Sequence, residues 1–150
     1  MNAFKQKLIT SCENYFTQKI SELTNALRDV TEAGNNETKS TAGDKHETAR
    51  AMMQLEQEKL SKQLQDAEIQ FADFEKIDFS RKTESVSLGS LIQSNKGLLF
   101  LATGIGKVMI DDKTIFVISH QSPLGKLLLG KKTKDTVVFN SVSYQIEALY

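Results

Sequence analysis

The sequence predicts an α+β protein: an N-terminal antiparallel coiled-coil hairpin of helices over residues 1–78, followed by a small antiparallel sheet domain with one short helix over residues 79–150. Heptad-spaced apolar residues fill the first part, and short β-prone runs between turn residues fill the second. The charges divide in the same way, with 10 basic and 14 acidic residues in the first part and 9 and 5 in the second. No dense basic stripe accompanies this mild asymmetry, so charge alone does not indicate nucleic-acid binding.

Two stretches of the first part carry apolar residues at alternating intervals of four and three. This repeat is typical of a helix that buries one narrow stripe against a partner helix. Met53 extends the second stripe upstream, and Gln57 interrupts it. The stripes consist of Phe16, Ile20, Leu23, Leu27 and Val30, and of Leu60, Leu64, Ala67, Phe71 and Phe74.

The segment that joins the stripes, residues 31–43, is polar and holds the turn-forming residues Gly34, Asn35, Asn36 and Gly43. Each flanking helix could run for about 30 residues, or about 45 Å. Folding the two helices back on each other buries both stripes, so we expect an antiparallel hairpin with residues 34–47 at its end. A parallel dimer that uses each stripe separately is the alternative.

The second part is expected to form six strands and one helix. The helix is predicted over residues 122–130, with Ser122 as its cap, Pro123 in the first turn and Gly130 at its end. Leu124, Leu127 and Leu128 are expected in the core. The predicted strands are Ser85–Gln93, Gly97–Thr103, Gly106–Ile110, Thr114–Ser119, Thr136–Asn140 and Ser143–Leu149.

An acidic pair stands at the start of the second helix. Asp44 and Glu47 are three residues apart and therefore share one face of a helix. Two carboxylates at the end of a hairpin could together hold a hard cation such as Mg²⁺. The same spacing also fits a capping box, which would be purely structural. Lys45 and Arg50 flank the acids and could contact a phosphate or a carboxylate of a partner, or simply be solvated.

Several catalytic interpretations are disfavoured. The run from Gly125 to Lys131 imitates a phosphate-binding loop, but Lys132 replaces the hydroxyl residue that would hold Mg²⁺. His46 and His120 are far apart, and Cys12 is expected to be a small buried residue on the first helix. An acyl transferase that uses Cys12 would need a pocket that a hairpin does not offer.

No membrane segment is expected, because the longest apolar run, Leu98–Ala102, is far shorter than the ~20 residues that cross a bilayer. The N-terminal residues lack the apolar core of a secretory signal. A cytoplasmic location is the expectation.

The chain resembles the Gre family of bacterial transcript-cleavage factors over nearly its whole length. The sharper match runs from Ser122 to Lys131, with Ile118-Ser119 before it and Asp135 and the Tyr144-x-Ile146 strand after it. The Gly-Asp-x-x-Glu sequence at Gly43–Glu47 is similar to the family's hairpin-tip motif, whereas Thr48, Arg50 and Ala51 depart from it. These departures indicate a divergent member.

The resemblance implies an FKBP-like C-terminal domain that docks on RNA polymerase core while the hairpin enters the secondary channel. Asp44 and Glu47 would then help the polymerase hold a Mg²⁺ ion near the 3′ end of backtracked RNA. Mg²⁺ would be bound only weakly by the factor alone, because two carboxylates leave most of its coordination sphere to water. Such a factor stimulates cleavage by the polymerase and is not an enzyme itself.

Three other hypotheses stay open. A regulator of the same shape could occupy the channel without stimulating cleavage, as the altered residues at Thr48, Arg50 and Ala51 allow. A prolyl isomerase is suggested by the FKBP-like shape, although it would need an aromatic proline pocket. A coiled-coil adaptor would depend on the stripes and not on the acids.

Overall fold

In the computed structural model, residues 2–37 and 43–150 are described, and the side chains of residues 36–37 and 43–46 lie outside that description. Two long helices come first: α1 (Asn2–Glu37) and α2 (Gly43–Glu75). Six strands follow: β1 (Leu91–Ser94), β2 (Gly97–Ala102), β3 (Gly106–Ile110), β4 (Lys113–Ser119), β5 (Thr136–Phe139) and β6 (Val142–Leu149). A short helix, α3 (Pro123–Leu128), lies between β4 and β5. The predicted fold class is confirmed.

The chain divides into two compact units. The hairpin unit comprises residues 13–71, and the sheet unit comprises residues 1–12 together with residues 72–150. The first turns of α1 and the last turn of α2 therefore belong to the sheet unit. Among the described residues, no helix combines the length and the apolar character that a bilayer span requires.

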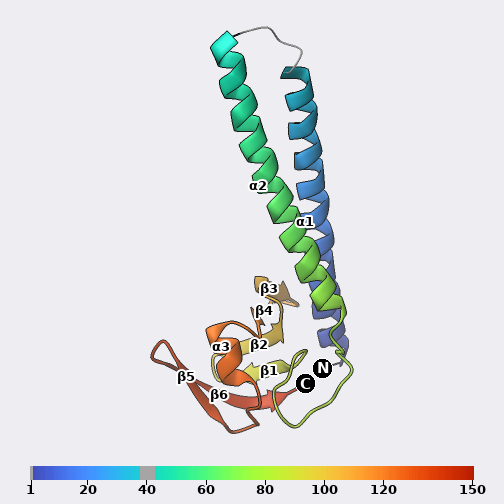
Figure 1. The fold of residues 1–150 in the computed structure, drawn as a ribbon. Coiled ribbons are helices and arrows are strands. Elements are labelled where there is room, and N and C mark those ends of the chain that lie inside the picture. Colours follow the sequence, from blue (N-terminus) through green and yellow to red (C-terminus); the bar gives the residue numbers. More distant parts are fainter. Residues whose placement is uncertain (1, 38–42) are drawn as a thin grey trace. The chain divides into compact units, whose positions relative to one another are not determined.

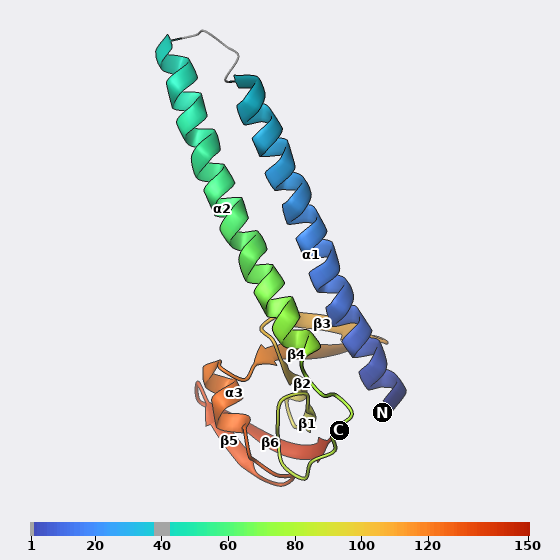
Figure 2. The same ribbon diagram turned by 45° about the vertical axis from the view of Figure 1, so that its right-hand side comes forward.

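In the hairpin unit, α1 and α2 run side by side in both ribbon views (Figures 1 and 2). The predicted stripe is the less exposed side of α2, because its described residues from Met53 to Phe74 are buried or half-buried at intervals of four and three. Phe16 of α1 stacks on Phe71 of α2 with ring centroids 5.3 Å apart. The apolar repeat therefore predicted which sides of the two helices face each other.

The connection between the two helices is shorter than the predicted residues 31–43. α1 continues to Glu37, so Gly34, Asn35 and Asn36 are helical and do not form a turn. A glycine inside a helix costs only about 1 kcal/mol, and the helices are still bonded to each other at this level, where the Gln57 amide donates to the Thr31 hydroxyl. The two helices are therefore still in contact within one turn of Gly34.

The sheet has the order β3-β4-β2-β1-β6-β5 (Figure 1). Its neighbouring strands are antiparallel except β2 and β4, which are parallel and pair Leu98 with Ile115 at one end and Ala102 with Ser119 at the other. The predicted strand Ser85–Gln93 begins only at Leu91, because Gly89 adopts a φ of +95° and turns the chain there.

Helix α3 matches its predicted signals. The hydroxyl of Ser122 accepts a hydrogen bond from the Gly125 amide at 3.1 Å, Pro123 begins the helix, and Gly130 follows its end with a φ of +78°. Leu128 is fully buried and Leu124 packs against the core. Leu127 was wrongly expected in the core: its side chain is 42% exposed, because it falls on the outer side of this short helix.

The sheet is covered by apolar side chains on both faces. One face carries a core cluster to which Leu128 of α3 contributes, formed by Val86, Ile92, Leu99, Leu101, Leu128, Val137 and Ile146. Phe100 lies between Leu99 and Leu101 and therefore points to the opposite face. There it stacks on Phe79, which in turn contacts Phe74 at the end of α2. This second face is where the ends of the long helices meet the sheet.

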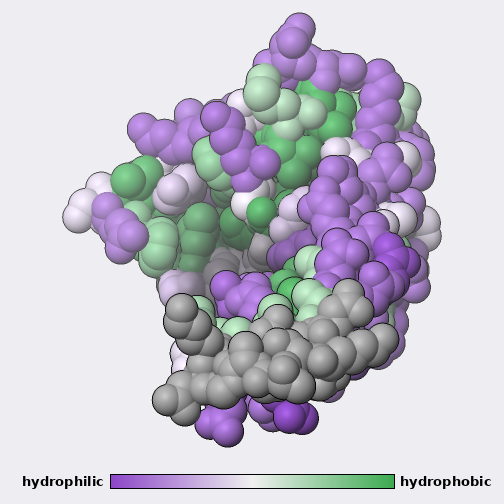
Figure 3. Space-filling view, turned by 90° about the horizontal axis from the view of Figure 1, so that it is seen from above, coloured by the Kyte–Doolittle hydropathy of each residue, from purple (hydrophilic) through white to green (hydrophobic). Residues whose placement is uncertain are grey.

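Hydrophilic side chains dominate the face of the molecule drawn in Figure 3, and hydrophobic ones gather on it in patches. Among the exposed large apolar residues, Met109 and Phe116 lie on the neighbouring strands β3 and β4. Cys12 is buried, as expected for a small apolar residue.

Candidate functional site

The candidate site lies at the start of α2, where the sequence places its acidic pair. Positions 44 and 47 both fall within the first two turns of α2, three residues apart. Such positions share one side of a helix. The helix is described from Gly43 onward, so both positions lie on helical backbone.

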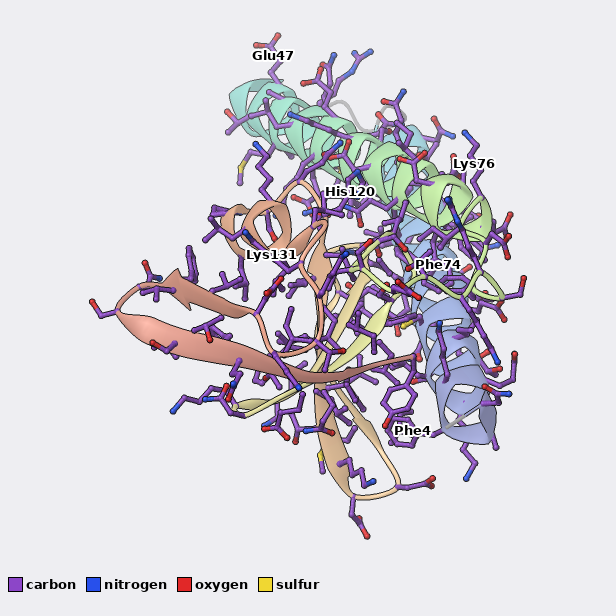
Figure 4. All side chains as sticks on the ribbon, turned by 90° about the horizontal axis from the view of Figure 1, so that it is seen from below. Phe4, Glu47, Phe74, Lys76, His120 and Lys131 are labelled. Carbon is purple, nitrogen blue, oxygen red and sulfur yellow. The ribbon has the colours of Figure 1, made fainter. Side chains whose placement is uncertain are left out.

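Glu47 is the described member of the pair. Its side chain is exposed and points away from α2 into solvent (Figure 4). The side chains of Asp44 and Lys45 lie outside the described residues, so their contacts stay predictions. An exposed carboxylate of this kind is accessible to a cation or to a partner.

Arg50 lies one turn further along α2 and is also exposed. It lines a small cavity of about 270 Å³ together with Gly34 and Asn35 of α1 and Gln54 of α2. The arginine is therefore close to the last turns of α1, and the guanidinium adds a positive charge one turn from Glu47. A contact between Arg50 and a partner stays a prediction.

The position of the apolar stripe on α2 determines which side of the helix these residues occupy. Ala49, Met53 and Gln57 are half-buried and face α1, whereas Glu47 and Arg50 are exposed. Glu47 therefore lies outside the helix interface.

The carboxylates at this end do not form a complete metal site. Among the residues that the structure describes, no group of three or more His, Cys, Asp and Glu side chains could hold a metal ion. Glu47, with or without Asp44, could supply only part of the coordination sphere of Mg²⁺, because this ion requires six ligands. A Mg²⁺ ion at this position would need further ligands from water or from a partner.

Sequence reasoning missed a second feature, a cavity of about 500 Å³ in the sheet unit that the start of α1 and the segment after α2 both line. The buried Lys5 belongs to this cavity. The apolar stripe of α1 could have indicated this cavity. When its spacing of four and three is continued backward from Phe16 through Cys12, it reaches residue 5, where a lysine stands in place of an apolar residue.

Solved structures that are similar to this chain include two of Gfh1. The chain is similar to the crystal structure of GreA factor homolog 1 (Gfh1) of Thermus thermophilus, with 15% identity, a TM-score of 0.39 and coverage of 92% of this chain and 94% of that chain. It is similar in the same degree to a structure described as that of the transcription factor Gfh1, with coverage of 92% of each chain. No protein-family description and no curated protein matches the sequence.

Proposed function

We propose that this protein is a transcription factor of the Gre type, which binds RNA polymerase core and stimulates cleavage of backtracked RNA in the cytoplasm. The observation that carries the proposal is the acidic pair of positions 44 and 47 at the connected end of a two-helix hairpin. The Gre-like sequence from Ser122 to Lys131 supports it independently.

The hairpin suits insertion into a narrow channel. The apolar stripes pack between the two helices, as the stacked rings of Phe16 and Phe71 illustrate. The outer faces are largely polar, apart from the exposed side chains of Met52, Leu55 and Ile69. A paired rod of this kind keeps its direction without support from a surrounding domain. It can therefore carry the acids of its connected end into a channel.

The acids would act inside the active centre of the polymerase. Asp44 and Glu47 would supply oxygen ligands to a Mg²⁺ ion that the polymerase also holds, and a second metal ion in such a centre activates water and stabilises the leaving oxygen. Lys45 and Arg50 would offset the negative charge of RNA phosphates nearby. The protein has no catalytic role of its own in this proposal.

A second candidate is a regulator that occupies the channel without stimulating cleavage. Arg50 favours it, because this position is acidic in the tip motif that the sequence otherwise resembles. A cation one turn from Glu47 would weaken the attraction of the tip for a metal ion.

The deciding experiment adds the protein to a stalled, backtracked RNA polymerase complex with Mg²⁺ and follows the length of the RNA. Shortened RNA is expected with the natural sequence, and the Asp44→Asn/Glu47→Gln variant should lose this activity while it still competes for the polymerase. The matched control is Asp66→Asn/Glu68→Gln, which removes the same charge from exposed positions further along α2 and should retain cleavage.

Binding without RNA shortening would favour the channel-occupying regulator. Absence of binding to core polymerase would contradict both candidates and leave the structural adaptor.

A further inference from the structure

We infer that the cavity beside Lys5 binds an organic phosphate of about the size of a mononucleotide. The cavity lies wholly within the sheet unit and measures about 500 Å³, a volume typical of small-molecule sites. This inference does not depend on the proposed function.

The lining carries positive charge without a matching side-chain carboxylate. Lys5, Arg81 and Lys82 line the cavity, and none of the described residues around it is Asp or Glu. The first turn of α1, which forms one wall, also has no acidic residue. An anion that enters the cavity would therefore supply the missing negative charge.

Lys5 is the buried member of this set, with only 8% of its surface exposed. Its amine donates hydrogen bonds to the main-chain oxygens of Phe79, at 3.2 Å, and Tyr150, at 3.1 Å. Burial lowers the pKa of this amine below its ordinary value of 10.5. These partners are main-chain oxygens, so no described side-chain carboxylate compensates the desolvated charge of Lys5.

Arg81 and Lys82 are exposed and lie on the segment that follows α2. Asp78 and Glu84 are the nearest acidic residues in sequence. The carboxylate of Asp78 accepts hydrogen bonds from the amide and the hydroxyl of Ser80, at 3.1 and 2.6 Å. These bonds, reinforced by the charge of Arg81, lower the pKa of Asp78. Asp78 thus shapes the loop and offsets Arg81 in part, but it does not line the cavity.

The rest of the lining suits the body of an organic ligand. Ile9, Phe79, Leu149 and Tyr150 provide apolar surface, and Phe79 is held in place by ring contacts with Phe74 and Phe100. Hydroxyl groups come from Ser80, Thr83 and Ser90. Cations and aromatic walls in one cavity match a phosphate joined to a flat ring.

Two of the three cations, Arg81 and Lys82, are exposed, so solvent screens their charge. We therefore expect moderate affinity, with a dissociation constant of about 0.1–1 mM.

The test is titration of the full-length protein with AMP, adenosine and inorganic phosphate in separate experiments, monitored by calorimetry and by amide chemical shifts. AMP should bind more tightly than either fragment, and the shifts should centre on residues 79–83 and the first turns of α1. The Arg81→Ala/Lys82→Ala variant should weaken AMP binding at least about tenfold, since two charge contacts are lost. The matched control, Lys131→Ala/Lys132→Ala, removes the same charge elsewhere and should bind as the natural sequence does.

Lys5→Met provides a second variant, which should also lose binding if its amide spectrum shows that it is folded. Absence of shifts around the cavity at 10-fold the expected dissociation constant would overturn the inference. Equal affinity for AMP and inorganic phosphate, or equal weakening by the control variant, would overturn it as well. No outcome depends on RNA polymerase, so failure here leaves the proposed function untouched.

Discussion

The side-chain amide of Gln57 on α2 donates a hydrogen bond of 3.0 Å to the hydroxyl of Thr31 on α1. Both residues are half-buried, and Gln57 occupies a position of the heptad stripe that an apolar residue would normally fill. The Thr31 hydroxyl is satisfied on its other side, because it donates to the main-chain oxygen of Leu27 at 2.8 Å. A single polar pair of this kind fixes the register of a coiled coil at a cost in stability.

We therefore predict that Gln57→Leu stabilises the hairpin by about 1 kcal/mol, because an apolar side chain replaces an amide in the seam. Urea unfolding followed by circular dichroism measures the change. The same variant should form more dimer than the natural sequence in light scattering, since the pair no longer selects one register. Thr31→Val should instead destabilise by about 1 kcal/mol, because it leaves the amide of Gln57 without its acceptor. A loss of stability in Gln57→Leu would contradict this role.

Gly125 permits the close approach of α3 to the end of β4. A Cβ atom at this position would overlap the main-chain oxygen of Ser119 and lie 3.0 Å from the Cα atom of His120. Since backbone atoms cannot move aside cheaply, Gly125→Ala should lower the free energy of unfolding by about 3 kcal/mol.

The matched control is Gly104→Ala, because a Cβ atom there would meet only the Cβ atom of Ser119, at 4.0 Å. This substitution should change stability by less than about 0.5 kcal/mol. Thermal unfolding of both variants is the measurement, and equal Tm values for the two would contradict the steric argument.

Because of Lys5, the free energy of unfolding of the sheet unit should change with pH in the alkaline range. Its pKa is lowered by burial, so between this lowered value and 10.5 the unfolded chain binds more protons at Lys5 than the folded protein does. The free energy of unfolding therefore rises with pH across that window. We predict that the stability of the natural sequence relative to Lys5→Met increases from pH 7 to pH 10, as measured by urea unfolding.

Taking the difference between the two proteins cancels the titration of tyrosines and other lysines. A difference that stays constant with pH would show that the lysine keeps its ordinary pKa. Lys7→Met is the control, because the amine of Lys7 is exposed and pairs with Asp111 at 3.0 Å.

The spacing of apolar residues predicted the helical hairpin and the sides on which its helices pack, because each residue of a stripe makes the same kind of contact at a regular interval. It did not predict that Gly34, Asn35 and Asn36 continue α1, since these residue types favour turns over helix interiors. The parallel pairing of β2 with β4 also depends on the tertiary arrangement and has no local signal. Capping residues predicted α3 well because their hydrogen bonds are local.

The candidate site was predicted to a smaller extent. The sequence placed Glu47 in the first turns of α2, and the structure gives its side chain the expected exposure. The cavity beside Lys5 could not be predicted, because its walls come from residues 2–9, 79–90 and 149–150, which only the folded sheet unit brings together.

Two adjacent leucines of α3 should respond very differently to truncation. Leu128 is fully buried in the core cluster, whereas Leu127 is 42% exposed. Leu128→Ala leaves a cavity among Ile92, Leu101 and Ile146, so it should cost 2–5 kcal/mol, roughly, in the free energy of unfolding. Leu127→Ala has the same chemistry and the same helix propensity, yet it should cost less than about 0.5 kcal/mol. Urea unfolding of the pair measures this contrast, and similar losses in both variants would mean that Leu127 is covered in solution by a surface of the protein or of a second copy.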